Sequence, residues 1–193
     1  TGAYGEAPLR WYVGLAAYGD GYDDGLADEL LTMGYKSCVA TMDHREELSA
    51  GSGLLTSTCA GYSFGFYPWF SFNFLHTLHT GCGIDGTQIW SQMRDYPNYF
   101  NWMAIPNYES PGQFCDFGWG DSYHTSNALP VGTMYAHLAQ AIHFYGKVST
   151  ERAKQARAII EILPKQAKEH CGMAVFPYWP FIAVNFDPKE NDD

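Results

Sequence analysis

The chain has 193 residues and a formal net charge of −10, and 46% of its residues are hydrophobic, 17% aromatic and 17% charged. This length suits one domain with a substantial core, and this composition excludes a disordered chain. The acidic charge argues against nucleic acid as a partner, because nucleic-acid-binding proteins cluster lysine and arginine against phosphates. No apolar run approaches the roughly 20 residues that span a bilayer, so we expect no membrane partner. Many rings with few charges are typical of proteins that bind carbohydrate, because sugar rings present apolar faces to aromatic side chains.

The first fifty residues predict two helices. Residues 7–18 form a short apolar candidate, and Asp23 or Asp24 can cap a longer helix in which apolar residues recur at spacings of three and four. We expect this second helix to end near the cluster of small residues 49–53. The first residue is Thr rather than Met, so we expect the chain to be part of a longer one, and the chain shows no signal peptide.

A ring-rich stretch, GYSFGFYPWFSF, occupies residues 61–72 and leads into a helix predicted over 68–80. Pro68 suits the first turn of this helix, and Gly81 suits the position just past its end. At about 100° per residue, rings fall on both sides of the helix. We therefore expect an inner helix surrounded by protein, with the connection before Pro68 lining the mouth of a cleft.

The next segment predicts one interrupted helix and one long loop. Asp85 and Gln88 form a capping-box pattern for a helix over 89–100, which Pro97 interrupts. Residues 106–126 are rich in Pro, Gly, Ser and Asn and predict a long loop without a convincing strand pair.

Two further helices complete the predicted elements. Asn127 opens one that Gly146 ends, with an apolar stripe of Met, Tyr, Leu and Ile, and Ser149 caps another that runs towards Leu163. The lysines and glutamates after residue 150 predict a solvated outer face. The fold class is all-α, built from helical hairpins.

The five cysteines are odd in number and widely separated, which fits neither a disulfide framework nor a zinc site. We interpret them mostly as small buried hydrophobic residues and expect no metal and no cofactor.

Four stretches carry a resemblance to a known family. They are GYSFGFYPWFSFNFLHTLHTGCGID (61–85), WSQMRDYPNYFNWMAIPN (90–107), PGQFCDFGWGDSYHTSNALPVGTMYAHLAQA (111–141) and FPYWPFIAVNFDP (176–188). Their order and spacing resemble the second half of the α/α toroid of heparinase II/III-type polysaccharide lyases. The resemblance implies that residues 1–193 are a single, incomplete (α/α) toroid, without the family's N-terminal helices and following β-sandwich domain. It also implies a secreted or periplasmic location.

The resemblance implies β-elimination on an acidic polysaccharide or oligosaccharide that contains uronic acid. This reaction removes the proton α to the sugar carboxylate, neutralises that carboxylate and protonates the leaving oxygen. Tyr67 is our first choice for the base and Tyr62 our second, since both precede a helix N-terminus, whose dipole favours the phenolate. The family's upstream Asn-His pair is not visible, and its His from the β-sandwich lies beyond this chain, which leaves open whether the chain is active alone.

Several other residues are candidates for substrate contact. Trp69 and Trp119 are possible sugar platforms, and Tyr123 and His124 lie on a loop where polar and aromatic residues often contact ligands. Asp121 either acts as a general acid or holds its loop by accepting backbone N–H groups.

The pair His76 and His79, three residues apart, could ligate a metal, but such histidines more often line a cleft or the core. Arg94 could bind a substrate carboxylate, but a surface ion pair with Asp95 is the favoured interpretation.

Two other functions stay open at this point. A toroidal glycoside hydrolase would need two carboxylates across its cleft, for which Asp116 and Asp121 are the candidates. A non-catalytic domain could bind glycan through Tyr67, Trp69 and Trp119.

Overall fold

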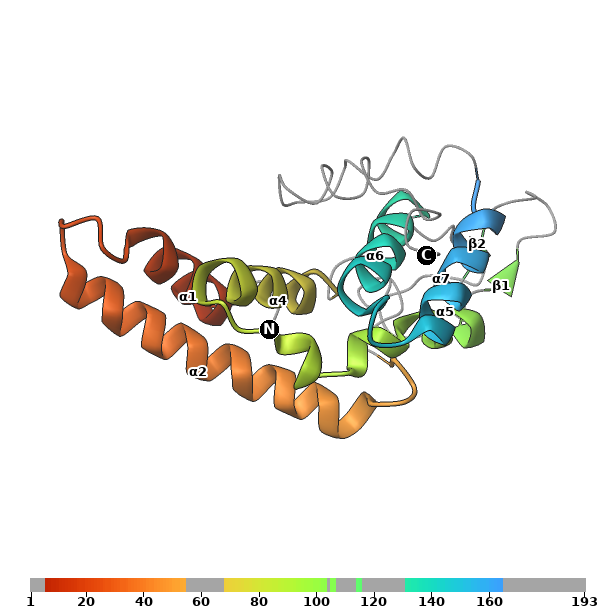
Figure 1. The fold of residues 1–193 in the computed structure, drawn as a ribbon, viewed down its shortest axis with the longest axis horizontal. Coiled ribbons are helices and arrows are strands. Elements are labelled where there is room, and N and C mark those ends of the chain that lie inside the picture. The colour runs from red at the N-terminus through yellow and green to blue at the C-terminus, as the bar shows by residue number, and fades with distance from the viewer. Residues whose placement is uncertain (1–5, 55–67, 104, 107–113, 116–130, 165–193) are drawn as a thin grey trace.

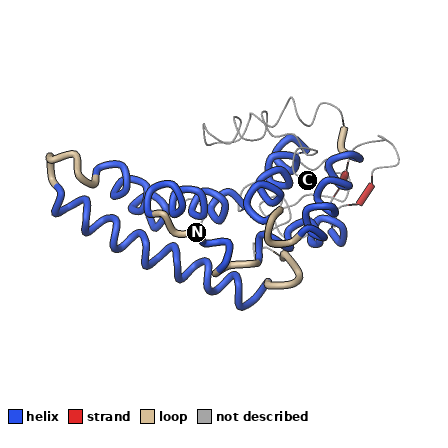
Figure 2. Tube along the Cα trace, viewed as in Figure 1, coloured by secondary structure: helices blue, strands red, loops and turns tan. Residues whose placement is uncertain are grey.

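The computed structural model describes residues 6–54, 68–103, 105–106, 114–115 and 131–164, and these are mostly helical (Figure 2). The elements are α1 (Glu6–Ala17), α2 (Asp24–Ser49), α4 (Pro68–Cys82), the 3-10 turns η1 (Gly86–Gln88) and η2 (Gln92–Asp95), α5 (Tyr96–Met103), β1 (Ile105–Pro106), β2 (Phe114–Cys115), α6 (Val131–Tyr145) and α7 (Thr150–Ile162). The all-α prediction is confirmed. None of the helices in these ranges is both long and apolar enough to cross a bilayer.

Helices α1 and α2 form a hairpin, and Figure 1 shows α2 running along α1 and on past α4. As predicted, Asp23 caps α2: its carboxylate accepts the backbone N–H of Leu26 at 2.9 Å. Gly14 and Gly34 lie where the two backbones meet, and a Cβ at Gly34 would collide with the backbone of Trp11. These glycines therefore allow the close approach of α1 and α2.

Helix α4 is covered by protein on both sides, as the ring pattern predicts. Trp11 packs edge-on against Phe74 at 5.3 Å between ring centroids, and on another side Phe72 stacks on His137 at 6.1 Å. The first eight residues of the helix, 68–75, are all buried. Phe72 and Phe74 are completely excluded from solvent.

The end of α4 lies two residues beyond the predicted one. Gly83, not Gly81, takes the left-handed conformation, with φ of 71°, and its N–H donates to the carbonyl of His79 at 2.9 Å. Gly81 is inside the helix instead, where a larger residue would press on the Leu15 side chain of α1.

The predicted helix over 89–100 is wrong as one continuous element. Asp85 caps the first turn as expected, accepting the Thr87 hydroxyl at 2.6 Å and the Thr87 backbone N–H at 3.0 Å. The chain then makes two 3-10 turns before α5. Pro97 interrupts nothing, because it is the second residue of α5, where its missing N–H has no helical partner to lose.

A short strand pair begins one residue before the predicted loop over 106–126 and extends into it. Ile105 pairs with Cys115 and Pro106 with Phe114 in an antiparallel arrangement. The expectation of no strand pair is therefore corrected by this two-residue bridge.

Helices α6 (Val131–Tyr145) and α7 follow the predicted pattern, while the predicted start of the first at Asn127 lies outside the described residues. The stripe of α6 is buried, and the helix ends at Tyr145, one residue before Gly146. The Ser149 hydroxyl accepts the N–H of Arg152 at 3.4 Å and caps α7. The charged face of α7 is exposed at Glu151, Lys154 and Glu161.

Helices α1, α4 and α6 run in the same direction. The contacts that set this direction are Trp11–Phe74 and Leu15–Gly81 between α1 and α4, and Trp69–His137 and His76–Phe144 between α4 and α6. In each pair of helices, moving towards the C-terminal end of one helix brings contacts nearer the C-terminal end of the other. The C-terminal ends of α4 and α6 therefore lie together, as do their N-terminal ends.

Two cysteines in the described ranges lie in different environments, one buried and one exposed. Cys38 is completely buried in the core, as predicted, whereas Cys82 at the end of α4 is exposed. The interpretation of the cysteines as buried hydrophobic residues is thus corrected for Cys82.

Candidate ligand-binding cleft

Most of the residues predicted to act on a substrate fall outside the described ranges. These are Tyr62, Tyr67, Asp116, Trp119, Asp121, Tyr123 and His124. Their roles stay predictions. Trp69 and His76 are described: Trp69 lies in the first turn of α4, and His76 lies about two turns further along the helix.

Trp69 lies in the interface between α4 and α6. Its side chain is only 3% exposed, and its ring meets His137 edge-on at 6.4 Å between centroids. His137 itself is completely buried, in contact with the rings of Phe72 and Tyr96 as well. In this arrangement the Trp69 ring faces α6, and its predicted role as a sugar platform stays untested.

His76 lies on the wall of a cleft of about 550 Å³ at the C-terminal ends of α4 and α6. The charged and titratable side chains that line it are His76 and His79 from α4, Asp85 from the turn before η1, and His143 and Lys147 from the end of α6 and the turn after it. Thr80, Thr87 and Gln88 add hydroxyl and amide groups. His76 thus lines a cleft in the described part of the chain, and its predicted contact with substrate stays a prediction.

An aromatic ring links the histidines on the two helices. Phe144 meets His76 edge-on at 6.3 Å and His143 edge-on at 5.0 Å between ring centroids. Behind it, Phe72 stacks on the same ring at 5.9 Å, which fixes Phe144 against the core. Leu75 and Val148 complete an apolar part of the wall.

Two histidines of this cleft, His76 and His143, favour their neutral form. Burial lowers the pKa of His76, and the nearby His143 and His79 lower it further because two protonated imidazoles repel each other. The pKa of His143 is also lowered, because the surrounding protein displaces water from its ring. Hydrogen bonding from the Thr87 side chain lowers the pKa of Asp85, so this carboxyl is ionised at neutral pH.

The groups of this cleft that can bind a ligand are side chains rather than the carbonyl groups of the helix ends. The carbonyl of His79 accepts the N–H of Gly83 at 2.9 Å, and the carbonyl of Ile142 accepts that of Gly146 at 2.7 Å. These bonds satisfy carbonyl groups in the last turn of α4 and of α6.

The described residues do not form a metal centre. Within the ranges that the structure covers, no group of three or more His, Cys, Asp and Glu side chains is placed to hold a metal ion. The alternative of His76 and His79 as ligands of such a centre therefore finds no third ligand there.

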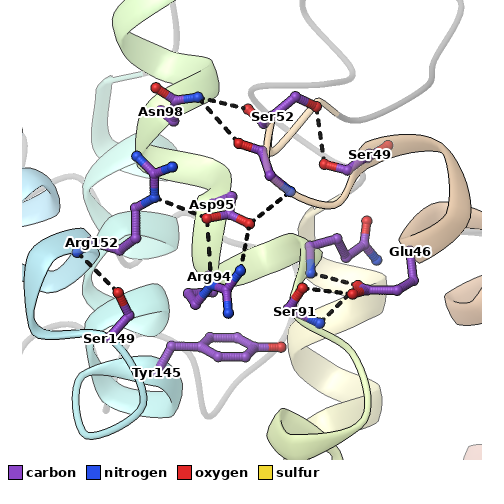
Figure 3. A network of polar contacts seen from close by, with 12 residues as sticks. Glu46, Ser49, Ser52, Ser91, Arg94, Asp95, Asn98, Tyr145, Ser149 and Arg152 are labelled. Carbon is purple, nitrogen blue, oxygen red and sulfur yellow. Dashed lines mark hydrogen bonds and ion pairs between the residues drawn. The ribbon is translucent and has the colours of Figure 1, made fainter.

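A second polar cluster lies at the C-terminal end of α2 (Figure 3). Asp95 is 2% exposed and accepts from Arg152 Nε at 2.9 Å, from Arg94 Nη2 at 3.1 Å and from the backbone N–H of Gly51 at 2.9 Å. The predicted surface pair of Arg94 and Asp95 is therefore corrected, because its carboxylate is buried and shared. We call these four residues the Asp95 network.

Glu46 makes a similar set of bonds next to this network. Its carboxylate accepts the backbone N–H of Ser91 at 2.7 Å, the Ser91 hydroxyl at 2.6 Å and the backbone N–H of Gln92 at 2.8 Å (Figure 3). Together with the Asp95 network, these bonds attach η2 to α2 and α7. Hydrogen bonds that use so much of each carboxylate indicate a structural role.

Sequence reasoning missed His143 and Lys147 as cleft residues. The sequence does hold a signal for His143. In HTG (79–81) and in HFYG (143–146), a histidine lies two or three residues before a glycine near the end of a helix. Comparison of the chain with protein-family models, with curated proteins and with solved structures gives no match in any of the three.

Proposed function

We propose that this chain is part of an (α/α) toroid that acts on uronic-acid-containing polysaccharide by β-elimination. The single observation that carries the proposal is the position of α4, buried between α1 and α6, which run in the same direction. In a toroid of helical hairpins, inner helices run parallel in this way because each is followed by a returning outer helix. Here α1 is followed by α2 and α6 by α7 through short connections.

The proposed reaction takes place at the N-terminal end of α4. Tyr67 immediately precedes Pro68, the first residue of the helix, and Tyr62 lies five residues further upstream. The positive end of the helix dipole favours a phenolate near this end and so assists a tyrosine base. Such a tyrosine removes the proton α to the carboxylate and, once protonated, can return a proton to the leaving oxygen. The proposed setting is secreted or periplasmic.

The test is an incubation of the protein with a panel of uronic-acid polysaccharides, followed by ultraviolet absorbance. A lyase leaves a double bond in the new non-reducing sugar, whose absorbance grows with each cleavage. New reducing ends without this absorbance would mean a hydrolase, and binding without either would mean a glycan-binding domain.

Matched tyrosine variants identify the base. Tyr67→Phe is expected to lower the rate by at least about 100-fold, because it removes the proton acceptor and keeps the ring. Tyr18→Phe serves as the control, since Tyr18 is 60% exposed after α1. A full rate in Tyr67→Phe with a large loss in Tyr62→Phe would move the role to Tyr62, and full rates in both would exclude a tyrosine base at this connection.

A further inference from the structure

The cleft at the C-terminal ends of α4 and α6 lies away from the proposed reaction site. At a rise of about 1.5 Å per residue, Pro68 at the start of α4 is about 12 Å along the helix from His76 and about 16 Å from His79. The proposed reaction uses the N-terminal end at Pro68, whereas the cleft is lined by His76 and His79 near the other end. The cleft therefore needs an explanation of its own.

The charge of the cleft depends on whether its imidazoles are protonated. Among the residues that the structure describes, five charged or titratable side chains line it: His76 and His79 on α4, Asp85 before η1, and His143 and Lys147 at the end of α6 and after it. With neutral imidazoles, the positive charge of Lys147 balances the negative charge of Asp85. With protonated imidazoles, four cationic groups face a single carboxylate, whose oxygen is already engaged by Thr87.

The uncharged groups of the cleft favour a sugar over a simple ion. Thr80, Thr87 and Gln88 offer hydroxyl and amide groups, and the ring of Phe144 with Leu75 offers an apolar surface. The volume of about 550 Å³ falls among the roughly 300–1,000 Å³ of small-molecule sites. A ligand that satisfies all of these groups has a carboxylate, several hydroxyls and an apolar ring face.

We propose that this cleft binds a sugar acid through His76, His79, His143 and Lys147, and that binding requires protonated imidazoles. The carboxylate of the ligand accepts charge-assisted hydrogen bonds from the imidazolium and ammonium groups, which are stronger than bonds between neutral groups. Because burial opposes protonation of His76 and His143, and repulsion from its neighbours opposes that of His76 further, the ligand is taken up together with protons. This site does not depend on lyase activity at the other end of α4.

Isothermal titration calorimetry with D-glucuronate at about pH 5.5 and about pH 7.5 tests the proposal. We expect a Kd at least about tenfold lower at the acidic pH, and proton uptake measured from buffers of different ionisation enthalpy. D-glucose, which lacks the carboxylate, is expected to show no such pH dependence. A uronate oligosaccharide in a parallel titration distinguishes a chain end from a free sugar acid, according to which of the two binds more tightly.

Variants locate the binding. The double variant His76→Gln, His143→Gln is expected to weaken acidic binding by at least about tenfold, whereas His44→Gln, an exposed histidine on α2, leaves it unchanged. Lys147→Gln, with exposed Lys154→Gln as its control, gives a second comparison that does not disturb the core. Far-ultraviolet circular dichroism checks that each variant is folded. Equal affinity at the two pH values, no binding at acidic pH, or equal losses in cleft and control variants would each overturn the proposal.

Discussion

The Asp95 network and the histidine cleft are both polar, but they use their polar groups differently. The carboxylate of Asp95 is 2% exposed and accepts four hydrogen bonds from three protein residues. The cleft instead presents His79, His143 and Lys147 on exposed positions around an open volume. A charge whose bonds are used within the protein stabilises the fold, whereas groups that face open volume are available to a ligand.

Removing the charge of Asp95 should cause the largest loss of stability. Asp95→Asn leaves the guanidinium groups of Arg94 and Arg152 without their shared carboxylate, and breaking a buried pair in this way costs at least about 3 kcal/mol. We expect a loss close to this lower bound because the two arginine side chains are 30% and 25% exposed. Urea denaturation measures the free energy of unfolding.

The exposed Asp28 on α2 provides the matched control for this substitution. Asp28→Asn should change the free energy of unfolding by less than about 0.5 kcal/mol. Similar losses in both variants would mean that the Asp95 network contributes nothing beyond a surface charge.

Two glycines near Asp95 separate backbone strain from close packing. Gly51 and Gly53 both have positive φ, of 84° and 70°, but a Cβ at Gly53 would collide with the backbone of Asp95, whereas one at Gly51 meets no atom within 4 Å. Gly51→Ala should therefore cost about 1 kcal/mol and Gly53→Ala about 2 kcal/mol. Thermal and urea unfolding of both variants check the order, and equal costs would show that the close approach is relieved by a small shift.

The phenol of Tyr145 gives a smaller effect. Its hydroxyl donates to the carbonyl of Trp90 at 2.6 Å, and the side chain is 1% exposed. Tyr145→Phe keeps the packing and loses one buried hydrogen bond, which should lower the free energy of unfolding by about 1 kcal/mol. Tyr18→Phe, at 60% exposure, should leave it unchanged. A loss as large in Tyr18→Phe would attribute the effect to something other than the buried bond.

The sequence predicts the helix limits well where the signal is local. Asp23 and Ser149 cap the helices that follow them, and both bonds join residues three positions apart. The sequence predicts the end of α4 two residues too early, because Gly81 and Gly83 are both glycines and either can follow the end of a helix. Only the packing of Leu15 against Gly81 and the left-handed conformation of Gly83 distinguish them.

Contacts between distant parts of the chain explain the remaining differences. Glu46 binds the backbone of Ser91 and Gln92 across 45 and 46 residues, and these bonds accompany the 3-10 turns that replace a continuous helix. Asp95 is buried by Arg152, which lies 57 residues away. The meeting of His76 with the end of α6 depends likewise on how the helices pack, so the sequence indicates one wall of the cleft but not the other.

The last prediction concerns the cleft and is the smallest in size. The folded-state pKa values of His76 and His143 lie below the ordinary 6.5, so above that pH both states are neutral and these groups leave stability unchanged. As the pH falls below 6.5, the unfolded chain takes up protons first, and the folded state loses stability until the pH passes below the folded-state pKa values. Urea denaturation between about pH 7.5 and 5.5 should show a steeper fall in the wild type than in the double variant His76→Gln, His143→Gln. His44→Gln should keep the wild-type slope. Equal slopes in all three proteins would show that protonating His76 and His143 does not destabilise the folded state. The cleft would then resemble the Asp95 network, and an acidic ligand would relieve no repulsion by binding there.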